Sequence, residues 1–162
     1  MVTEYNISEV DYVRAMKLFS KITPKIAAIY VAAIAALGAA AVFAPPVVKG
    51  GAIGGLIGGA MVIILGQHIV NPFLARRHYR KYKAIQEPIH IQLKDDGVEF
   101  STADGKGLLR WEKILKWRQN EDYVLIYPMP RLYHIVPKTI KESGFDLLAL
   151  TKMLEARVGN ET

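Results

Sequence analysis

The fold of this chain is decided by residues 26–70, which read IAAIYVAAIAALGAAAVFAPPVVKGGAIGGLIGGAMVIILGQHIV. Two apolar runs, residues 26–43 and 52–70, contain no Asp, Glu, Lys or Arg, and a short segment with two prolines separates them. At about 1.5 Å per helical residue, each run approaches the roughly 30 Å hydrocarbon core of a bilayer. The sequence therefore predicts a transmembrane helical hairpin over residues 26–72, with helices at 26–44 and 52–70.

Two other interpretations of these runs are less favoured. A helix in the core of a soluble protein normally keeps a polar stripe, whereas these runs are polar only at Tyr30 and at the pair Gln67 and His68. A cleaved signal peptide does not fit either, because a long polar segment with three acidic residues precedes the first run and a second apolar run follows it at once.

The net charge of +6 is concentrated beside the apolar runs. Residues 1–85 contain 10 basic and 3 acidic residues, whereas residues 86–162 contain 11 basic and 12 acidic residues. Four cations precede the first run, five follow the second, and only Lys49 lies between the runs. By the positive-inside rule, we expect a multi-pass protein of the inner (cytoplasmic) membrane with both termini in the cytoplasm.

A basic cluster follows the second run, in a juxtamembrane linker predicted over residues 73–87. Such cations attract anionic lipid headgroups at about 1 kcal/mol each. The cluster consists of Arg76, Arg77, Arg80, Lys81 and Lys83. We expect membrane lipids rather than nucleic acid as the partner, because the charge excess lies beside the membrane segment. The chain has no Cys, so disulfides and thiolate metal sites are excluded.

Small residues form ridges along both predicted helices. The ridge of the first run is Ala28, Ala32, Ala36 and Ala40, and the ridge of the second is Gly51, Gly55 and Gly59, beside Gly50, Gly54 and Gly58. Lipid gives little hydrophobic drive for helix association, so close packing over small residues must supply it. We expect the ridges to face each other or a second copy of the chain in a homo-oligomer. The alternative is that Ala and Gly are simply frequent in membrane helices.

Residues 1–25 are predicted to form a short strand and a basic amphipathic helix. Residues 2–7 alternate like a strand, and Ser8 and Asp11 have the spacing of a capping box at the start of a helix. The sequence leaves open whether this helix lies on lipid headgroups or packs against the C-terminal domain. Thr23 is the expected cap of the membrane helix that begins at Pro24.

Residues 88–162 change to an alternating pattern with turn signals. Asp95-Asp96-Gly97 and Asp104-Gly105-Lys106-Gly107 are expected turns that separate three strands, and the third strand is expected at residues 108–111. Further strands are expected at residues 114–119, 123–127 and 132–136. A final helix is expected to start near Ser143 or Gly144. The predicted fold class is an α+β membrane protein, in which a cytoplasmic antiparallel β-domain capped by a C-terminal helix follows the transmembrane hairpin.

Short motifs within residues 96–140 resemble the C-terminal domain of the YcxB-like family of bacterial membrane proteins. They are Leu109-Arg110-Trp111-Glu112-Lys113-Ile114, Glu121-Asp122-Tyr123-Val124-Leu125-Ile126-Tyr127 and Ile135-Val136-Pro137-Lys138. The resemblance implies two membrane helices followed by a barrel similar to pleckstrin-homology (PH) domains, and it brings no catalytic residues. The chain departs from the family pattern at Trp117 and at residues 128–130.

The two tryptophans are expected to have different roles. Trp111 belongs to the family motif and has an apolar sheet to pack on, so it is predicted to lie in the core. Trp117 has cations on both sides, and Trp117 and Arg118 are therefore predicted to contact a partner or a headgroup at the surface.

No catalytic site, metal site or cofactor is predicted. The four histidines, which are His68, His78, His90 and His134, share no metal-ligand spacing. The Gly-rich second run lacks the Gly-Lys-Ser/Thr ending of a phosphate-binding loop. His68, near the inner end of the second helix, either contacts an ion or lipid or snorkels to the interface.

Two function classes remain. In the first, the chain is a non-enzymatic inner-membrane protein whose cytoplasmic PH-like domain binds a protein partner or lipid headgroups. In the second, it is a membrane immunity protein that neutralises a bacterial toxin on behalf of the producing cell. A toxin gene next to this gene would favour the second class.

Overall fold

The computed structural model describes residues 2–20 and 24–161, and the chain divides into two compact units. The hairpin unit is Ser20–Leu74, and the β unit takes its described residues from 2–19 and 75–161. The expected cap Thr23 lies outside the described residues. The β unit is therefore assembled from both sides of the hairpin, in contrast to the predicted division into separate segments 1–25 and 88–162.

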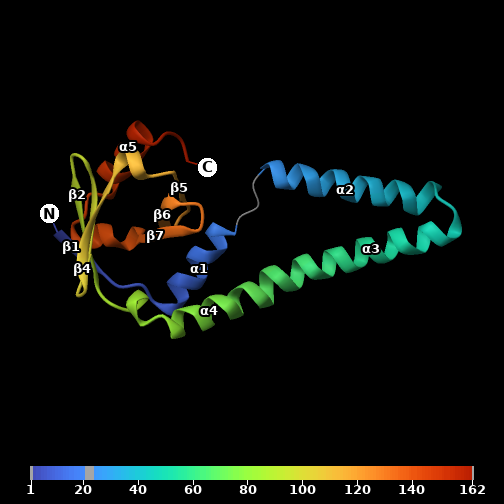
Figure 1. Cartoon of the computed structure of the whole chain (residues 1–162), viewed down its shortest axis with the longest axis horizontal. Helices are drawn as coiled ribbons and strands as arrows, with labels where there is room; N and C mark the ends of the chain where they lie inside the picture. Colours follow the sequence, from blue (N-terminus) through green and yellow to red (C-terminus); the bar gives the residue numbers. More distant parts are fainter. Residues whose placement is uncertain (1, 21–23, 162) are drawn as a thin grey trace. The chain divides into compact units, whose positions relative to one another are not determined.

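Two long helices, α2 (Pro24–Phe43) and α3 (Pro46–Leu65), form the hairpin unit and run antiparallel (Figure 1). Helix α2 and the helical stretch Pro46–Lys81, which begins with α3, are long and apolar enough to be candidate membrane spans. Helix α3 begins six residues before the predicted position 52, because Pro46 stands in its first turn, where a missing N–H and a preset φ favour helix initiation. A π-helical turn (Gly66–Val70) follows α3, and α4 (Asn71–Lys81) follows that turn.

The predicted contact between the Gly and Ala ridges is not present in this hairpin. A Cβ atom on Gly55 would lie 3.9 Å from both Cδ atoms of Leu37, whereas Cβ atoms on Gly51 or Gly59 would meet nothing within 4 Å. Three ridge alanines, Ala28, Ala32 and Ala36, are exposed, and Ala40 is half-buried. The side chain of Leu37 is too large for the helix backbones to approach as closely as a ridge-to-ridge contact requires.

The N-terminal segment is integrated into the β unit. Strand β1 (Val2–Tyr5) pairs antiparallel with β2 (Ile89–Lys94), so Tyr5 lies opposite Ile89. Helix α1 (Glu9–Phe19) buries Ala15 and Leu18 and packs beside the strands of the second sheet. The predicted capping box is confirmed: the Asp11 N–H donates to Ser8 Oγ (3.1 Å) and the Ser8 N–H donates to Asp11 Oδ2 (3.0 Å). Helix α1 thus packs against the domain, which answers the question that the sequence left open.

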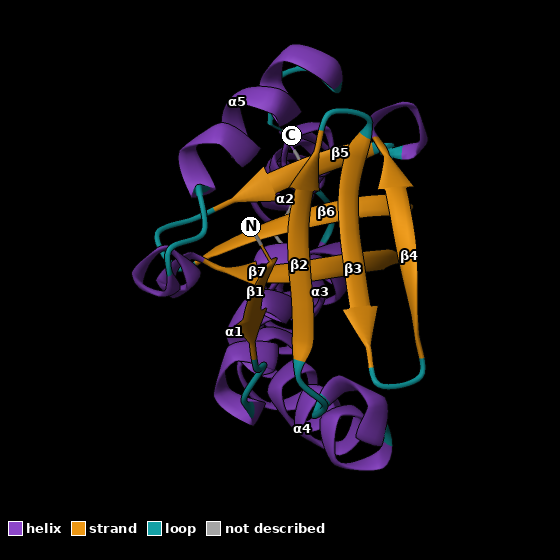
Figure 2. Ribbon diagram, turned by 90° about the vertical axis from the view of Figure 1, so that its left-hand side faces the viewer, coloured by secondary structure: helices purple, strands orange, loops and turns teal. Residues whose placement is uncertain are grey.

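Two antiparallel sheets make up most of the β unit. The first has the order β1-β2-β3-β4, with β3 at Gly97–Thr102 and β4 at Gly105–Arg110. The second has the order β5-β6-β7, with strands Lys116–Gln119, Tyr123–Met129 and Leu132–Pro137. The strands of the second sheet run across those of the first (Figure 2). Gly97 permits the close approach of β3 and β4, because a Cβ atom there would collide with the carbonyl oxygen of Leu109.

Helix α5 (Leu147–Arg157) ends the fold. Its cap is Asp146, whose side chain accepts a hydrogen bond from the Ala149 N–H at 2.8 Å, rather than Ser143 or Gly144 as predicted. Those two residues instead end a 3-10 helix (Lys138–Ser143), where Gly144 adopts a left-handed φ of 86°. Leu150 and Leu154 are fully buried and join the core of the two sheets.

Candidate functional site

The predicted basic linker is helical up to Lys81, and its β-unit portion is attached to the start of α1. The Tyr79 hydroxyl donates to the Ile7 carbonyl oxygen at 2.8 Å, and the ring of Tyr79 lies 6.0 Å from that of Tyr12. Arg80 donates two hydrogen bonds to the Glu9 carboxylate, at 3.0 and 3.2 Å. These contacts fix the position of Ala75–Lys81 on the β unit.

The five predicted headgroup cations fall into two groups. Arg76 and Arg80 share the Glu9 carboxylate, with 3.8 Å between Arg76 Nε and Glu9 Oε1. The Arg80 hydrogen bond and charge, together with the charge of Arg76, hold the pKa of Glu9 below its usual value. The second group is Arg77, Lys81 and Lys83, all exposed and without an ion pair in the described part of the chain. We call residues 75–83 the α4 segment and these three cations its free cations.

The structure corrects the predicted contact site at Trp117 and Arg118. Trp117 has 0% exposure, and its indole N–H donates to the Gly159 carbonyl oxygen at 2.7 Å. Arg118 is 7% exposed and donates to the carbonyl oxygens of Leu18 (3.3 Å) and Phe19 (3.2 Å). Neither side chain presents a surface to a partner.

Arg118 serves a structural purpose that the sequence did not reveal. The last carbonyl groups of a helix lack intrahelical donors and carry the negative end of the helix dipole. Arg118 meets both needs at the end of α1, about 100 residues away in sequence. Because the partner groups are backbone carbonyls on a distant element, no local sequence pattern could have assigned this role.

Trp111 lies in the core, as predicted. It is 5% exposed, and its indole N–H donates to the Asp95 carbonyl oxygen at 2.9 Å. The two tryptophans are thus both buried and both satisfied by a backbone carbonyl, which is the usual requirement for burying an indole.

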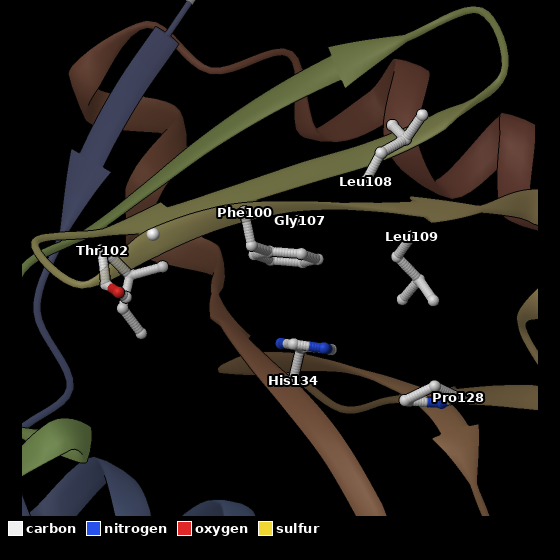
Figure 3. A pocket seen from close by; sticks show the side chains of 9 residues that line it. Phe100, Thr102, Gly107, Leu108, Leu109, Pro128 and His134 are labelled. Carbon is white, nitrogen blue, oxygen red and sulfur yellow. The ribbon is translucent and has the colours of Figure 1, made fainter.

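A pocket of about 400 Å³ lies between the two sheets (Figure 3). Phe100 from the first sheet stacks on His134 from the second, with ring centroids 4.3 Å apart. Gly105 and Gly107 line the pocket from β4, where their missing side chains leave the space between the sheets open. Burial lowers the pKa of His134 below its usual value, so this imidazole is neutral at pH 7.

The four histidines lie in separate environments. His134 stacks on Phe100, His78 lies 5.9 Å from the ring of Tyr82, and His90 approaches Glu4 at 3.9 Å. The Nδ1 atom of His68 lies 3.1 Å from the Ile64 carbonyl oxygen, one turn earlier. Among residues 2–20 and 24–161, no three His, Asp or Glu side chains gather in a group that could hold a metal ion.

Comparison with known proteins identifies one part of the chain. No curated protein and no solved structure matches this chain. Residues 93–153 match the model of a family described as YcxB-like protein. This segment contains the motif around Trp111 and runs from the end of β2 into α5, so it leaves out β1, α1 and the hairpin unit. Over residues 93–153, the chain belongs to the YcxB-like family.

Proposed function

We propose that this chain is a non-enzymatic protein of the cytoplasmic membrane, anchored by α2 and α3, that binds anionic lipid headgroups through the α4 segment. The observation that carries the proposal is the exposure of Arg77, Lys81 and Lys83 at and just after the C-terminal end of the second candidate membrane span, Pro46–Lys81. The β unit is then a cytoplasmic PH-like binding domain that this contact holds at the membrane surface.

The distribution of ion pairs within the β unit supports a lipid contact at these residues. Glu9 neutralises part of the charge of Arg76 and Arg80, whereas the three free cations meet no carboxylate in the described part of the chain. At about 1 kcal/mol per cation near an anionic surface, the three supply roughly 3 kcal/mol. That free energy corresponds to a preference of roughly 100-fold for anionic over neutral lipid.

The arrangement of the β unit supports the PH-like assignment. A sheet of four strands, a crossing sheet of three strands and a C-terminal helix are the parts expected from the family resemblance. The cytoplasmic placement of this unit rests on the charge asymmetry, because nine cations flank the two apolar runs and one lies between them.

Lipid retention tests the headgroup contact. The full chain is reconstituted in nanodiscs of equimolar phosphatidylcholine and phosphatidylglycerol, and the lipid retained after transfer to mild detergent is measured by mass spectrometry. We expect the triple variant Arg77→Gln, Lys81→Gln, Lys83→Gln to retain several-fold less phosphatidylglycerol than the unaltered chain. The matched control Lys141→Gln, Lys152→Gln, Arg157→Gln removes the same charge from exposed positions elsewhere in the β unit. Equal retention by both variants would refute the headgroup contact.

Cysteine labelling tests the topology independently. The chain has no native Cys, so a single Lys49→Cys or Asn160→Cys variant carries one thiol. A membrane-impermeant maleimide added to intact spheroplasts should label position 49 and spare position 160. Labelling at position 160 before lysis would place the β unit on the opposite side of the membrane.

A further inference from the structure

Strand β4 is an unpaired edge of the first sheet. It pairs with β3 and with no other described strand, and residues 103–108 together with Arg110 are exposed. An edge strand presents a row of backbone N–H and C=O groups that can pair with another chain. Two of the six residues of β4, Gly105 and Gly107, have no side chain that could shield the backbone.

The ladder between β3 and β4 determines which backbone groups face the open edge. The Trp111 N–H donates to the Asp96 carbonyl oxygen at 3.2 Å, in register with the pairs Val98–Leu109 and Phe100–Gly107. Hydrogen-bonded and non-hydrogen-bonded pairs alternate along an antiparallel ladder. Residues 107 and 109 therefore bond to β3, and the backbone groups of residues 106, 108 and 110 face outward.

The sequence of β4 is complementary to itself when reversed about Gly107. In an antiparallel pair with Gly107 opposite Gly107, the small Gly105 lies opposite Leu109, and Asp104, in the turn directly before β4, lies beside Arg110 of the other copy. The outward-facing groups of residue 106 then meet those of residue 108, as a hydrogen-bonded pair requires. Asp104 and Arg110 are exposed and form no ion pair with the described residues of their own chain.

Charge also selects this register over its neighbours. A shift by two residues in one direction places Lys106 directly opposite Lys106, and the opposite shift places Lys106 opposite Arg110 twice. Like charges directly opposite each other destabilise a strand pair, whereas opposite charges stabilise it. Of these three registers, the one about Gly107 places no two cations directly opposite each other.

We propose that β4 is a homodimer interface, in which two copies of this chain pair their β4 strands antiparallel about Gly107 and join their four-stranded sheets into one. The Leu109 side chain of each copy then lies beside Gly105 of the other, at the open side of the pocket between the sheets. The proposal concerns the β unit alone and does not depend on lipid binding.

Disulfide trapping tests the register directly, because the chain contains no Cys. Gly107→Cys places the thiols of the two copies opposite each other at a non-hydrogen-bonded pair, within the 4.4–6.8 Å range of Cα separation that a disulfide spans, about 4.5 Å here. In the matched control Gly105→Cys, the two thiols are offset by four residues, or about 13 Å along the strands. We expect a covalent dimer from Gly107→Cys in membranes treated with a mild oxidant, and at least tenfold less from Gly105→Cys. Equal trapping at both positions, no trapping, or trapping to a different protein at position 107 would overturn the proposal.

Charge reversal tests the same interface without a cross-link. Asp104→Arg or Arg110→Asp alone should weaken dimerisation of the full chain in detergent about tenfold, because each puts like charges opposite each other twice. The double variant should restore it. Asp104 lies in the turn before β4 and Arg110 is the last residue of β4, so the two lie at opposite ends of the strand in one chain and rescue can arise only between copies. A double variant as weak as the single variants, or single variants that dimerise normally, would contradict the proposal.

Discussion

The β unit and the hairpin unit use apolar side chains in opposite ways. In the β unit, Leu125 and Ile126 are completely buried, whereas in the hairpin unit Val62 is 71% and Phe43 is 86% exposed. Burial of apolar surface contributes about 25 cal/mol per Å², so the β unit draws its stability from its own core. The hairpin unit has almost no core of its own, as is typical of helices that could span a membrane.

The two units also show that a hydrophobic sequence can indicate two different surroundings. A short continuous apolar run, as in β6, indicates that protein covers both faces of a strand, whereas a long helix that is apolar on all sides indicates that something other than water surrounds it. Substitutions in the two units should therefore obey different rules. Five predictions, from the largest expected effect to the smallest, test this contrast.

Trp117→Ala should have the largest effect. Removing a fully buried indole should cost about 3–5 kcal/mol, which is a large part of the stability of a small domain. Chemical denaturation of the full chain in detergent, followed by the fluorescence of Trp111, measures the loss. Leu115→Ala, at a position 56% exposed, is the control and should change the free energy of unfolding by less than about 0.5 kcal/mol. Equal free energies of unfolding for the two variants would contradict the assignment of Trp117 to the core and Leu115 to the surface.

Arg118→Met should cost about 2 kcal/mol, because it keeps the aliphatic stem but removes charged donors from the carbonyl groups of Leu18 and Phe19. The effect should be local. Hydrogen exchange should accelerate in α1 more than in β3, and Arg131→Met, at an exposed position, should leave both unchanged. Uniform acceleration across the β unit would mean that Arg118 supports the core rather than the end of α1.

Tyr123→Phe should cost about 1 kcal/mol at pH 7, because it removes the hydrogen bond from the Tyr123 hydroxyl to Asp11 Oδ1 at 2.7 Å. Burial and the neighbouring Asp11 raise the pKa of Tyr123 to about 12. A group with a raised pKa in the folded state stabilises the fold below its ordinary pKa and loses that contribution as the pH rises through the folded value. The free energy of unfolding should therefore fall from about pH 10 to about pH 12, less steeply in Tyr123→Phe than in the unaltered chain. Identical slopes would contradict this assignment.

Asp11, which accepts the hydrogen bond from Tyr123, should affect the pH dependence of stability at low pH. Burial raises the pKa of Asp11, but hydrogen bonds from Ser8 and Tyr123 outweigh it, so the pKa is lowered overall. The stability that Asp11 contributes is present above its ordinary pKa and is lost as the pH falls through the lower folded value. Denaturation of Asp11→Asn should accordingly show a weaker dependence on pH below about 4.

Gly59→Ala should have the smallest effect and the opposite sign. A Cβ atom there meets nothing within 4 Å, and Ala is a better helix former than Gly by up to about 1 kcal/mol. Unfolding of the full chain in detergent, followed by helical circular dichroism, should show equal or slightly greater stability. Gly97→Ala is the contrasting variant in the β unit and should destabilise it, because the new Cβ collides with the Leu109 carbonyl oxygen. A clear loss of stability with Gly59→Ala would show that the Gly ridge packs against a partner.

Local patterns in the sequence were sufficient for several elements. The capping box at Ser8 and Asp11 was readable because both groups lie within one helical turn. The turns after β2 and after β3 were readable because Asp and Gly favour the conformations of tight hairpins, but the second turn is shorter than the predicted 104–107, since β4 already begins at Gly105. The two long helices followed from uninterrupted apolar runs, and the family motifs predicted the match between residues 93–153 and the YcxB-like family.

Features that join distant parts of the chain were not readable. The pairing of β1 with β2 joins residues on the two sides of the hairpin unit, so the sequence left open where the N-terminal segment packs. Trp117 was expected at the surface because Lys116 and Arg118 flank it, but the guanidinium of Arg118 turns inward to the end of α1. A charged neighbour predicts exposure only when no buried carbonyl group is available to accept its hydrogen bonds.

The sequence by itself therefore determined the division into an apolar hairpin and a β-rich domain, the charge asymmetry beside the hairpin, and the local caps and turns. These features depend on composition and on interactions within about one turn of helix or one hairpin. Only the tertiary structure decided which cations are free, where Arg118 and Trp117 lie, and that β4 is left as an open edge. Those outcomes depend on which strands pair and which buried groups find donors, and both are set by contacts between residues 100 or more positions apart in the sequence.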